Sequence, residues 1–326
     1  MQGRGNILHL GFKELRSLWR DKVLLLFVFF AFTGLIYVVS SATSIELNNA
    51  PIAVVDEDQS HLSNRIISAF FAPYFKTPDI IALSDENDSN QDGISGRPNR
   101  VWNVETKQTE LGRFGLKANK PTLEMIVAGA FANDLGITNS LESNQPCTDL
   151  QPTCLGMPNG NDEEDVELPD HLLKLVVNFN RNLAPVKRRK PNNQEVLAGR
   201  DLFYQSGCHQ CHNPSFTTQK SSEFPHLSKQ VIWPYSDFLL HDMGPDLADG
   251  RSDFLATGNE WRTPPLWGIG LLSQVNGMST LLHDGRARTV EEAIVWHGGE
   301  AEPAKNRFIH LAKEDRDRLI QFVNSL

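Results

Sequence analysis

The sequence has too little positive charge for a protein that binds nucleic acid. Its 326 residues include 31 lysines and arginines against 40 aspartates and glutamates, a formal net charge of −9 with a pI near 5.6. No large basic face is available to neutralise phosphates, so we expect no nucleic-acid partner. An acidic surface suits a basic redox partner protein instead.

Cysteine is also scarce, and the pattern of one pair leaves few chemistries open. Cys208 and Cys211 are followed directly by His212, which gives the spacing C-x-x-C-H. A zinc site would need a second ligand pair at zinc-finger spacing, and a dithiol redox motif would need a βαβ setting; the sequence shows neither. The pattern therefore favours one covalent haem c. Each thiol can add to a haem vinyl group, and His212 then becomes the proximal iron ligand.

The other two cysteines, Cys147 and Cys154, enclose a short polar loop. They are too far apart to make a second haem motif. In an oxidising compartment such a pair is expected to form a disulfide, and two free thiols are the alternative.

The N-terminal part holds one long hydrophobic run. Residues 23–42 are long enough to span a hydrocarbon core of about 30 Å and predict a transmembrane helix. Basic residues precede it, so the positive-inside rule places residues 1–22 in the cytoplasm and the rest outside. We therefore expect a single-pass protein of the bacterial inner membrane with its haem domain in the periplasm. A cleaved signal peptide ending at Ala42 is the alternative.

The remaining chain divides by composition. Residues 43–83 read as a small α/β fragment, with a strand near residues 50–58 and an amphipathic helix at residues 62–71. An acidic stretch then marks a boundary, after which residues 84–192 form a loop-rich region. Residues 193–326 predict a cytochrome c-like haem domain. The expected fold class is mainly α, with an irregular extension and one membrane helix before it.

The acidic stretch contains a partial calcium-loop pattern. Asp88, Asn90 and Asp92 alternate as oxygen ligands, and Gly93 follows at the sharp-turn position. Asn99 stands where such a loop would have a bidentate glutamate. A Ca²⁺ site and a solvated acidic turn therefore both remain open.

Two helices are expected to brace the haem segment. Val196, Gly199 and Phe203 fall on one face of a helix that begins near Asn193, and Gly199 would let a second helix cross closely. That second helix is predicted at residues 313–325, although Ala312 is a poor N-cap.

The second axial position of the iron decides between electron transfer and chemistry on a substrate. His297 ends a short predicted helix that starts with the capping box Thr289–Glu292, so it can be aimed rigidly. A histidine at a helix C-terminus is also favourable without any ligand role. The alternative ligand is Met243, and the further candidates are Met278, His241, His283, water or no ligand.

Several motifs in order carry a family likeness over residues 85–326: GRDLF at residue 199, CHQCH at 208, WRTPPLWG at 261, LHDGRA at 282 and EAIVWHGG at 292. They resemble the di-haem oxidoreductases related to bacterial cytochrome c peroxidases. The resemblance implies a periplasmic, mainly helical fold in which a C-terminal haem passes electrons and an N-terminal haem reduces peroxide. It also implies a distal ligand, often methionine, whose place His297 takes here.

A second likeness covers residues 1–81, where KELRSLWRDK at residue 13 and IAVVDED at residue 52 resemble the start of an ABC-2 type transporter permease. The later membrane helices of such a permease are missing, and so is the first haem motif of a di-haem protein. The chain therefore resembles two unrelated pieces joined near residues 81–85, through a rearrangement or as a selected membrane-anchored cytochrome.

We therefore expect outer-sphere electron transfer through one haem, with no catalytic acid or base. A peroxidase-type oxidoreductase that takes a second haem from a partner, and a truncated permease subunit, are the alternatives. Three arginines are candidates for pairing with haem propionates, with surface salt bridges as the other reading: Arg262, Arg286 and Arg288.

Overall fold

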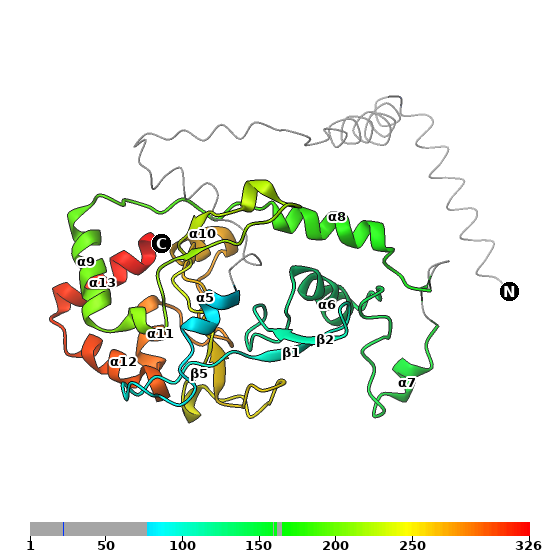
Figure 1. Ribbon diagram of the computed structural model, residues 1–326, viewed down its shortest axis with the longest axis horizontal. Coiled ribbons are helices and arrows are strands. Elements are labelled where there is room, and N and C mark those ends of the chain that lie inside the picture. Colours follow the sequence, from blue (N-terminus) through cyan, green and yellow to red (C-terminus); the bar gives the residue numbers. More distant parts are fainter. Residues whose placement is uncertain (1–21, 23–76, 159, 162–164) are drawn as a thin grey trace. The chain divides into compact units, whose positions relative to one another are not determined.

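The computed structural model describes residue 22 and residues 77–158, 160–161 and 165–326 (Figure 1). The described residues from 77 onward belong to one compact unit. The predicted membrane helix at 23–42 and the predicted strand and helix before residue 72 lie outside the described residues. So do residues 1–21 of the segment predicted to be cytoplasmic. Within the part that is described, no helix combines the length and the apolar character that a membrane crossing needs.

Helices α9 (Gln194–Gln205) and α13 (Lys313–Ser325) form the centre of the main core, side by side in Figure 1. Asn193 starts α9, because its side chain accepts hydrogen bonds from the backbone N–H groups of residues 195 and 196. Ala312 precedes α13 and provides no side-chain cap. Both helices were predicted at these positions.

The two helices pack through the buried faces of α9 and α13, and the face of α9 is the one that the residue spacing predicted. Val196 and Phe203 of α9 are buried, and so are Leu319 and Phe322 of α13. The crossing is closest at Gly199, where an added Cβ would lie 1.9 Å from the carbonyl oxygen of Arg318. Only glycine permits this approach, which confirms the expected close packing of the two helices.

Short helices complete the same half of the unit. They are η2 (Cys208–Gln210), η5 (Ile269–Leu271), α10 (Leu272–Asn276), α11 (Val290–Trp296), η6 (Gly299–Ala301) and α12 (Glu302–Ile309). Val290 of α11 and Phe308 of α12 join the core that α9 and α13 form. This core borders the cavity described below.

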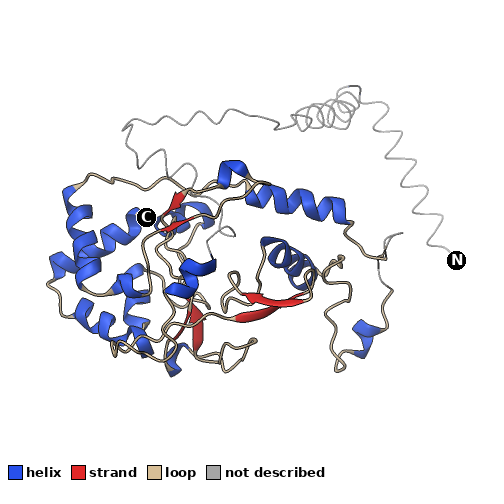
Figure 2. Cartoon of the chain, viewed as in Figure 1, coloured by secondary structure: helices blue, strands red, loops and turns tan. Residues whose placement is uncertain are grey.

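The described chain is not mainly α; it is a mixed and loop-rich fold (Figure 2). Three two-stranded antiparallel sheets occur in it: β1 (Arg100–Asn103) with β2 (Gln108–Leu111), β3 (Phe216–Thr217) with β4 (Val231–Ile232), and β5 (Leu240–Asp242) with β6 (Glu260–Arg262). In the last pair His241 faces Trp261. Long loops join these strands and contain the single turns η3 (Pro225–Leu227) and η4 (Pro245–Leu247). Helical periodicity in the sequence could not reveal such short strands and turns.

The loop-rich region contains its own small core. Helices α6 (Leu123–Leu135) and α8 (Asp170–Arg181) pack through Ala128, Leu173 and Val177. Pro169 is the N-cap of α8, and Asp170 is its first helical residue. A disulfide joins Cys147 to Cys154 around α7 (Pro152–Leu155), which confirms the predicted pairing.

Helix α5 (Thr77–Ala82) lies before the boundary predicted at residue 84. Its Ile80 is fully buried and packs in one cluster with Phe216, Ile232 and Phe238. The helix therefore belongs to the packed part of the unit that carries the C-x-x-C-H segment.

Candidate haem site

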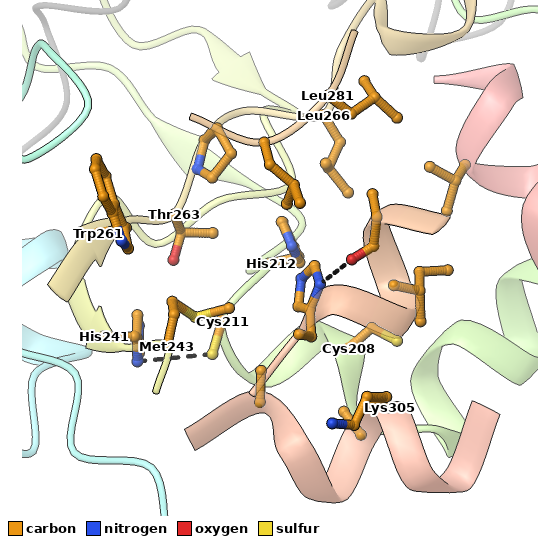
Figure 3. A pocket seen from close by; sticks show the side chains of 18 of the residues that line it. Cys208, Cys211, His212, His241, Met243, Trp261, Thr263, Leu266, Leu281 and Lys305 are labelled. Carbon is orange, nitrogen blue, oxygen red and sulfur yellow. Dashed lines mark hydrogen bonds between the residues drawn. The ribbon is translucent and has the colours of Figure 1, made fainter. Parts of the chain in front are cut away.

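A cavity of about 610 Å³ opens between the C-x-x-C-H turn, α11, α12, α13 and the loop at residues 261–269. Its walls are mostly apolar, with Phe203, Leu266 and Leu319 among them. Figure 3 shows Cys208, Cys211 and His212 on this wall. The cavity has the apolar lining and the size range of a small-molecule or cofactor pocket.

The two thiols belong to a tight turn. Cys208 opens the single turn η2, and the N–H of His212 donates to its carbonyl oxygen at 2.9 Å. Burial raises the pKa of the Cys208 thiol to about 12 and also raises that of Cys211. Catalytic dithiols instead have lowered pKa values, so the environment disfavours a redox-active dithiol.

His212 is anchored through one ring nitrogen. Its Nδ1 donates to the carbonyl oxygen of Tyr235 at 2.9 Å, which fixes the tautomer and leaves the Nε2 lone pair free for a metal. Burial lowers the pKa of His212 to about 4, so the ring is neutral, as a ligand must be.

His297, on another wall of the cavity, is also anchored through its Nδ1 atom. It is the C-cap residue of α11, and its Nδ1 donates to the carbonyl oxygen of Ala293 at 2.6 Å. Burial lowers its pKa, and its proximity further lowers that of His212. The predicted cap of α11 is present, because Thr289 Oγ1 accepts the N–H of Glu292 at 3.1 Å.

These residues fit a covalent haem. Two thiols line a cavity of suitable character, and two neutral imidazoles on its walls each keep one nitrogen free. His212 and His297 would hold the iron, and Cys208 with Cys211 would hold the porphyrin edge.

The other predicted distal ligands separate by position. Met243 lines the same cavity, so it remains the alternative to His297. Met278 is 63% exposed and is not on the cavity wall. His283 lines the cavity, but its ring stacks on Trp261 with the ring centroids 3.7 Å apart.

His241 is buried and has both ring nitrogens occupied. Nδ1 lies 2.6 Å from a carboxylate oxygen of Glu300, and Nε2 lies 2.8 Å from one of Asp237. Its Nδ1 also lies 3.7 Å from the sulfur of Cys211, the contact drawn in Figure 3. With no free nitrogen, His241 cannot bind the iron while this arrangement persists.

The partners also set the charge of His241. Burial would lower its pKa, but Asp237 and the other contacts outweigh burial and raise it well above the usual value. Burial likewise opposes ionisation of Glu300, yet the hydrogen bonds from His241 and Ser95 lower its pKa to about 2. The cavity wall therefore contains a buried imidazolium between two carboxylates.

Cys211, Asp237 and His241 also place a sulfur, an oxygen and a nitrogen within 4.8 Å of one another. It is the one cluster of at least three such acidic, cysteine or histidine ligands within the described ranges. The ion pairs of His241 account for this proximity without a metal. The sequence did not single out the cluster, because Cys211 lies 30 residues from His241 in the chain.

Of the three predicted arginines, Arg262 alone lines the cavity. Its Nε donates to the carbonyl oxygen of Gly115 at 2.8 Å, and burial lowers its pKa to about 10. Arg286 pairs with Asp284 at 2.6 Å, and Arg288 lies exposed off the cavity wall. Two cations that the sequence did not indicate do line the cavity: Lys305 and Arg307.

The partial calcium loop folds as a compact turn. Asp88 accepts hydrogen bonds from the N–H groups of Asp92 and Gly93, and Asn90 Oδ1 accepts the N–H of Asp92 at 3.0 Å. The amide of Asn99 is buried and donates to the carbonyl oxygens of residues 117 and 253. The calcium site stays a prediction.

The residues that form this cavity lie in a part of the chain that matches a known protein family. A family described as "di-haem oxidoreductase, putative peroxidase" matches residues 68–326. The chain belongs to this di-haem oxidoreductase family. The match includes the C-x-x-C-H segment, His212 and His297, so membership of an oxidoreductase family that binds haem agrees with the residues of the cavity. No solved structure matches the chain.

A second likeness confirms the resemblance predicted for residues 1–81. Over 87 residues the chain is 48% identical to the inner membrane transport permease YhhJ of Escherichia coli (strain K12), and equally to that of Shigella flexneri. The matched segment is 27% of this di-haem oxidoreductase chain and only 23% of either permease. The chain thus spans about a quarter of the length of these curated relatives.

Proposed function

We propose that this chain is a c-type cytochrome that transfers single electrons between protein partners. The thiols of Cys208 and Cys211 would hold one haem by adding to its two vinyl groups, and His212 would bind its iron. His297 would be the second histidine to bind the iron. When bound, the haem supplies an iron that changes by one electron between its ferric and ferrous states.

The observation that carries the proposal is the matched pair of cavity histidines. Each donates its Nδ1 hydrogen to a backbone carbonyl, at 2.9 Å for His212 and 2.6 Å for His297. Each ring is thereby held in one tautomer with Nε2 free, the usual preparation of a histidine ligand. Two histidines that both bind the iron would leave it no position for a substrate, and such a haem would supply electron transfer rather than catalysis.

Optical spectra of the oxidised and reduced protein test this proposal. The account predicts a six-coordinate, low-spin spectrum in wild type and in Met243→Ala, and loss of that spectrum in His297→Ala. An unchanged spectrum in His297→Ala would remove His297 from the distal position. Met243→Ala is the matched control, because Met243 lines the same cavity.

Peroxide chemistry is the second candidate, because the description of the family includes the words "putative peroxidase". The chain has only one C-x-x-C-H motif, so this function would use a second haem supplied by a partner. If His212 and His297 both hold the iron, peroxide should bind to it poorly. Rapid peroxide turnover by the purified protein alone would favour the peroxidase over the electron-transfer role.

Membrane anchoring through residues 23–42, with the haem domain in the periplasm, is part of the same proposal. It is supported by the likeness to an inner membrane permease and by the disulfide Cys147–Cys154, which suits an oxidising compartment. Haem staining of separated membrane and soluble fractions tests the anchor. Protease treatment of spheroplasts should remove the haem domain if it faces the periplasm. Co-purification with an ATPase would instead indicate a permease subunit.

A further inference from the structure

A second cavity, of about 600 Å³, lies beside the haem cavity and has no part in the function proposed above. Arg188, Arg200, Tyr204, Trp233 and Trp267 contribute to its walls. Its volume falls in the range of small-molecule sites. Aromatic rings form much of the wall, and two guanidinium groups provide positive charge.

Arg188 brings unsatisfied hydrogen-bond donors to this cavity. Its Nε and Nη2 atoms are buried and have no hydrogen-bond partner among the described residues. The guanidinium carbon lies 5.2 Å from the ring centroid of Phe322, a contact that holds the group but accepts nothing from its edge. A buried charged donor without an acceptor costs more free energy than a neutral one, so an acceptor is expected here.

The two free atoms of Arg188 specify the shape of that acceptor. Nε and Nη2 lie on one edge of the planar guanidinium, the edge that pairs side-on with two oxygens of a carboxylate. Trp233 adds a third donor, because its Nε1 is buried and also lacks a partner in the described part of the chain.

No acid on this wall meets the need. Asp201 lines the cavity but pairs with Arg200 at 3.1 Å. An oxygen of the terminal carboxylate of Leu326 accepts the N–H of Gly268 at 3.1 Å. Neither acid occupies the Nε–Nη2 edge of Arg188, which therefore has no acceptor among the described residues.

We propose that this second cavity binds an organic carboxylate with a flat aromatic body. The carboxylate occupies the Nε–Nη2 edge of Arg188, and one of its oxygens accepts the indole N–H of Trp233. The aromatic body lies among Tyr204, Trp233 and Trp267, where ring faces favour stacking.

The position of the cavity connects such a ligand to the proximal side of the haem site. Tyr235 lines the second cavity, and its carbonyl oxygen accepts the Nδ1 hydrogen of His212. Trp267 lines both cavities. Tyr235 would therefore lie between a bound carboxylate and His212.

Calorimetric titration of the haem-loaded protein with 2-naphthoate tests the proposal. We expect binding at least about tenfold tighter than that of 2-naphthamide, which has the same ring without the charge, because a charge-assisted bidentate pair is lost. Equal affinity for the two compounds would overturn the proposal. So would no binding of 2-naphthoate at millimolar concentration, which would mean that water or a haem propionate satisfies Arg188.

Variants locate the site. Arg188→Gln should weaken 2-naphthoate binding about tenfold or more, and Arg188→Lys should weaken it less, because lysine keeps the charge but loses the fork. Arg251→Gln makes the same charge change at an exposed arginine that does not line the cavity, and should leave the affinity unchanged. Unchanged affinity in both Arg188 variants, with a wild-type haem spectrum as proof of folding, would contradict the assignment.

Discussion

Two parts of the same cavity wall use histidine in opposite ways. His212 and His297 each have one nitrogen on a backbone carbonyl and one free, and burial keeps both rings neutral. His241 has both nitrogens on carboxylates, and its pKa is raised well above the usual value. The comparison teaches that the partners of a buried histidine, rather than its position on the wall, decide whether it can hold a metal or must hold a charge.

The largest difference between the two kinds of histidine should appear when His241 and His297 are each replaced by alanine. His241→Ala leaves Asp237 and Glu300 as buried carboxylates without their cation, and such losses cost about 3–5 kcal/mol. We expect that loss in the free energy of unfolding by denaturant, with the axial ligands of the haem retained. His297→Ala should change the haem spectrum instead. A normal stability for His241→Ala, or a changed axial ligation, would break the comparison.

The pH dependence of stability is a second test of the charged cluster around His241. The folded pKa of Glu300 is about 2, below its ordinary 4.5, so its contribution is complete above pH 4.5 and is lost as the pH falls toward 2. Glu300→Gln should flatten the acid side of the stability profile over that interval. Glu302→Gln, at an exposed position on α12, should retain the wild-type profile.

His241 should affect the stability on the alkaline side of the pH profile. Its folded pKa is raised, so its contribution is present below the ordinary value of 6.5 and is lost as the pH rises through the folded pKa. Denaturant unfolding of wild type should show stability that falls as the pH rises above 6.5, and His241→Gln should remove that fall. A fall of equal size in His241→Gln would assign it to other groups.

The helix crossing beneath the cavity gives a smaller effect. Gly199→Ala would place a Cβ 1.9 Å from the carbonyl oxygen of Arg318, so α9 and α13 must separate. We expect a loss of about 1–3 kcal/mol in unfolding free energy, the usual cost of overpacking. Ala198→Gly, one position earlier on α9, changes the backbone without that clash and should cost about 0.5–1 kcal/mol. An equal loss in both variants would contradict the role of the crossing.

The smallest effect concerns the helix that positions His297. Thr289→Ala removes the oxygen that accepts the N–H of Glu292, and losing such a cap costs about 1 kcal/mol. Thr289→Ser keeps the oxygen and should be close to wild type. Thermal unfolding followed by circular dichroism distinguishes the two, and equal melting temperatures would show that the cap contributes nothing.

Sequence reasoning succeeded where the relevant contacts are local. The period of Val196, Gly199 and Phe203 predicted the buried face of α9, and the Thr289 cap with the glycines after His297 predicted α11. The disulfide followed from a short loop between two cysteines. In each case the residues that interact are near neighbours in the chain or lie on one helix.

Prediction failed where contacts join distant segments. Nothing in the sequence around His241 indicates Glu300, and without that partner the histidine resembled a ligand. Arg286 and Arg288 were placed with Arg262 by residue type, yet the fold directs only Arg262 to the cavity. The mixed fold was missed for the same reason, because strands of two to four residues leave no periodicity.

The mass of the mature protein tests the central claim most directly. Protein made in cells competent for cytochrome c assembly should be heavier than its polypeptide by one haem, and the added mass should survive acid and organic solvent. The double variant Cys208→Ala, Cys211→Ala should weigh only what its amino acids weigh. A wild-type protein with the bare polypeptide mass would contradict the account.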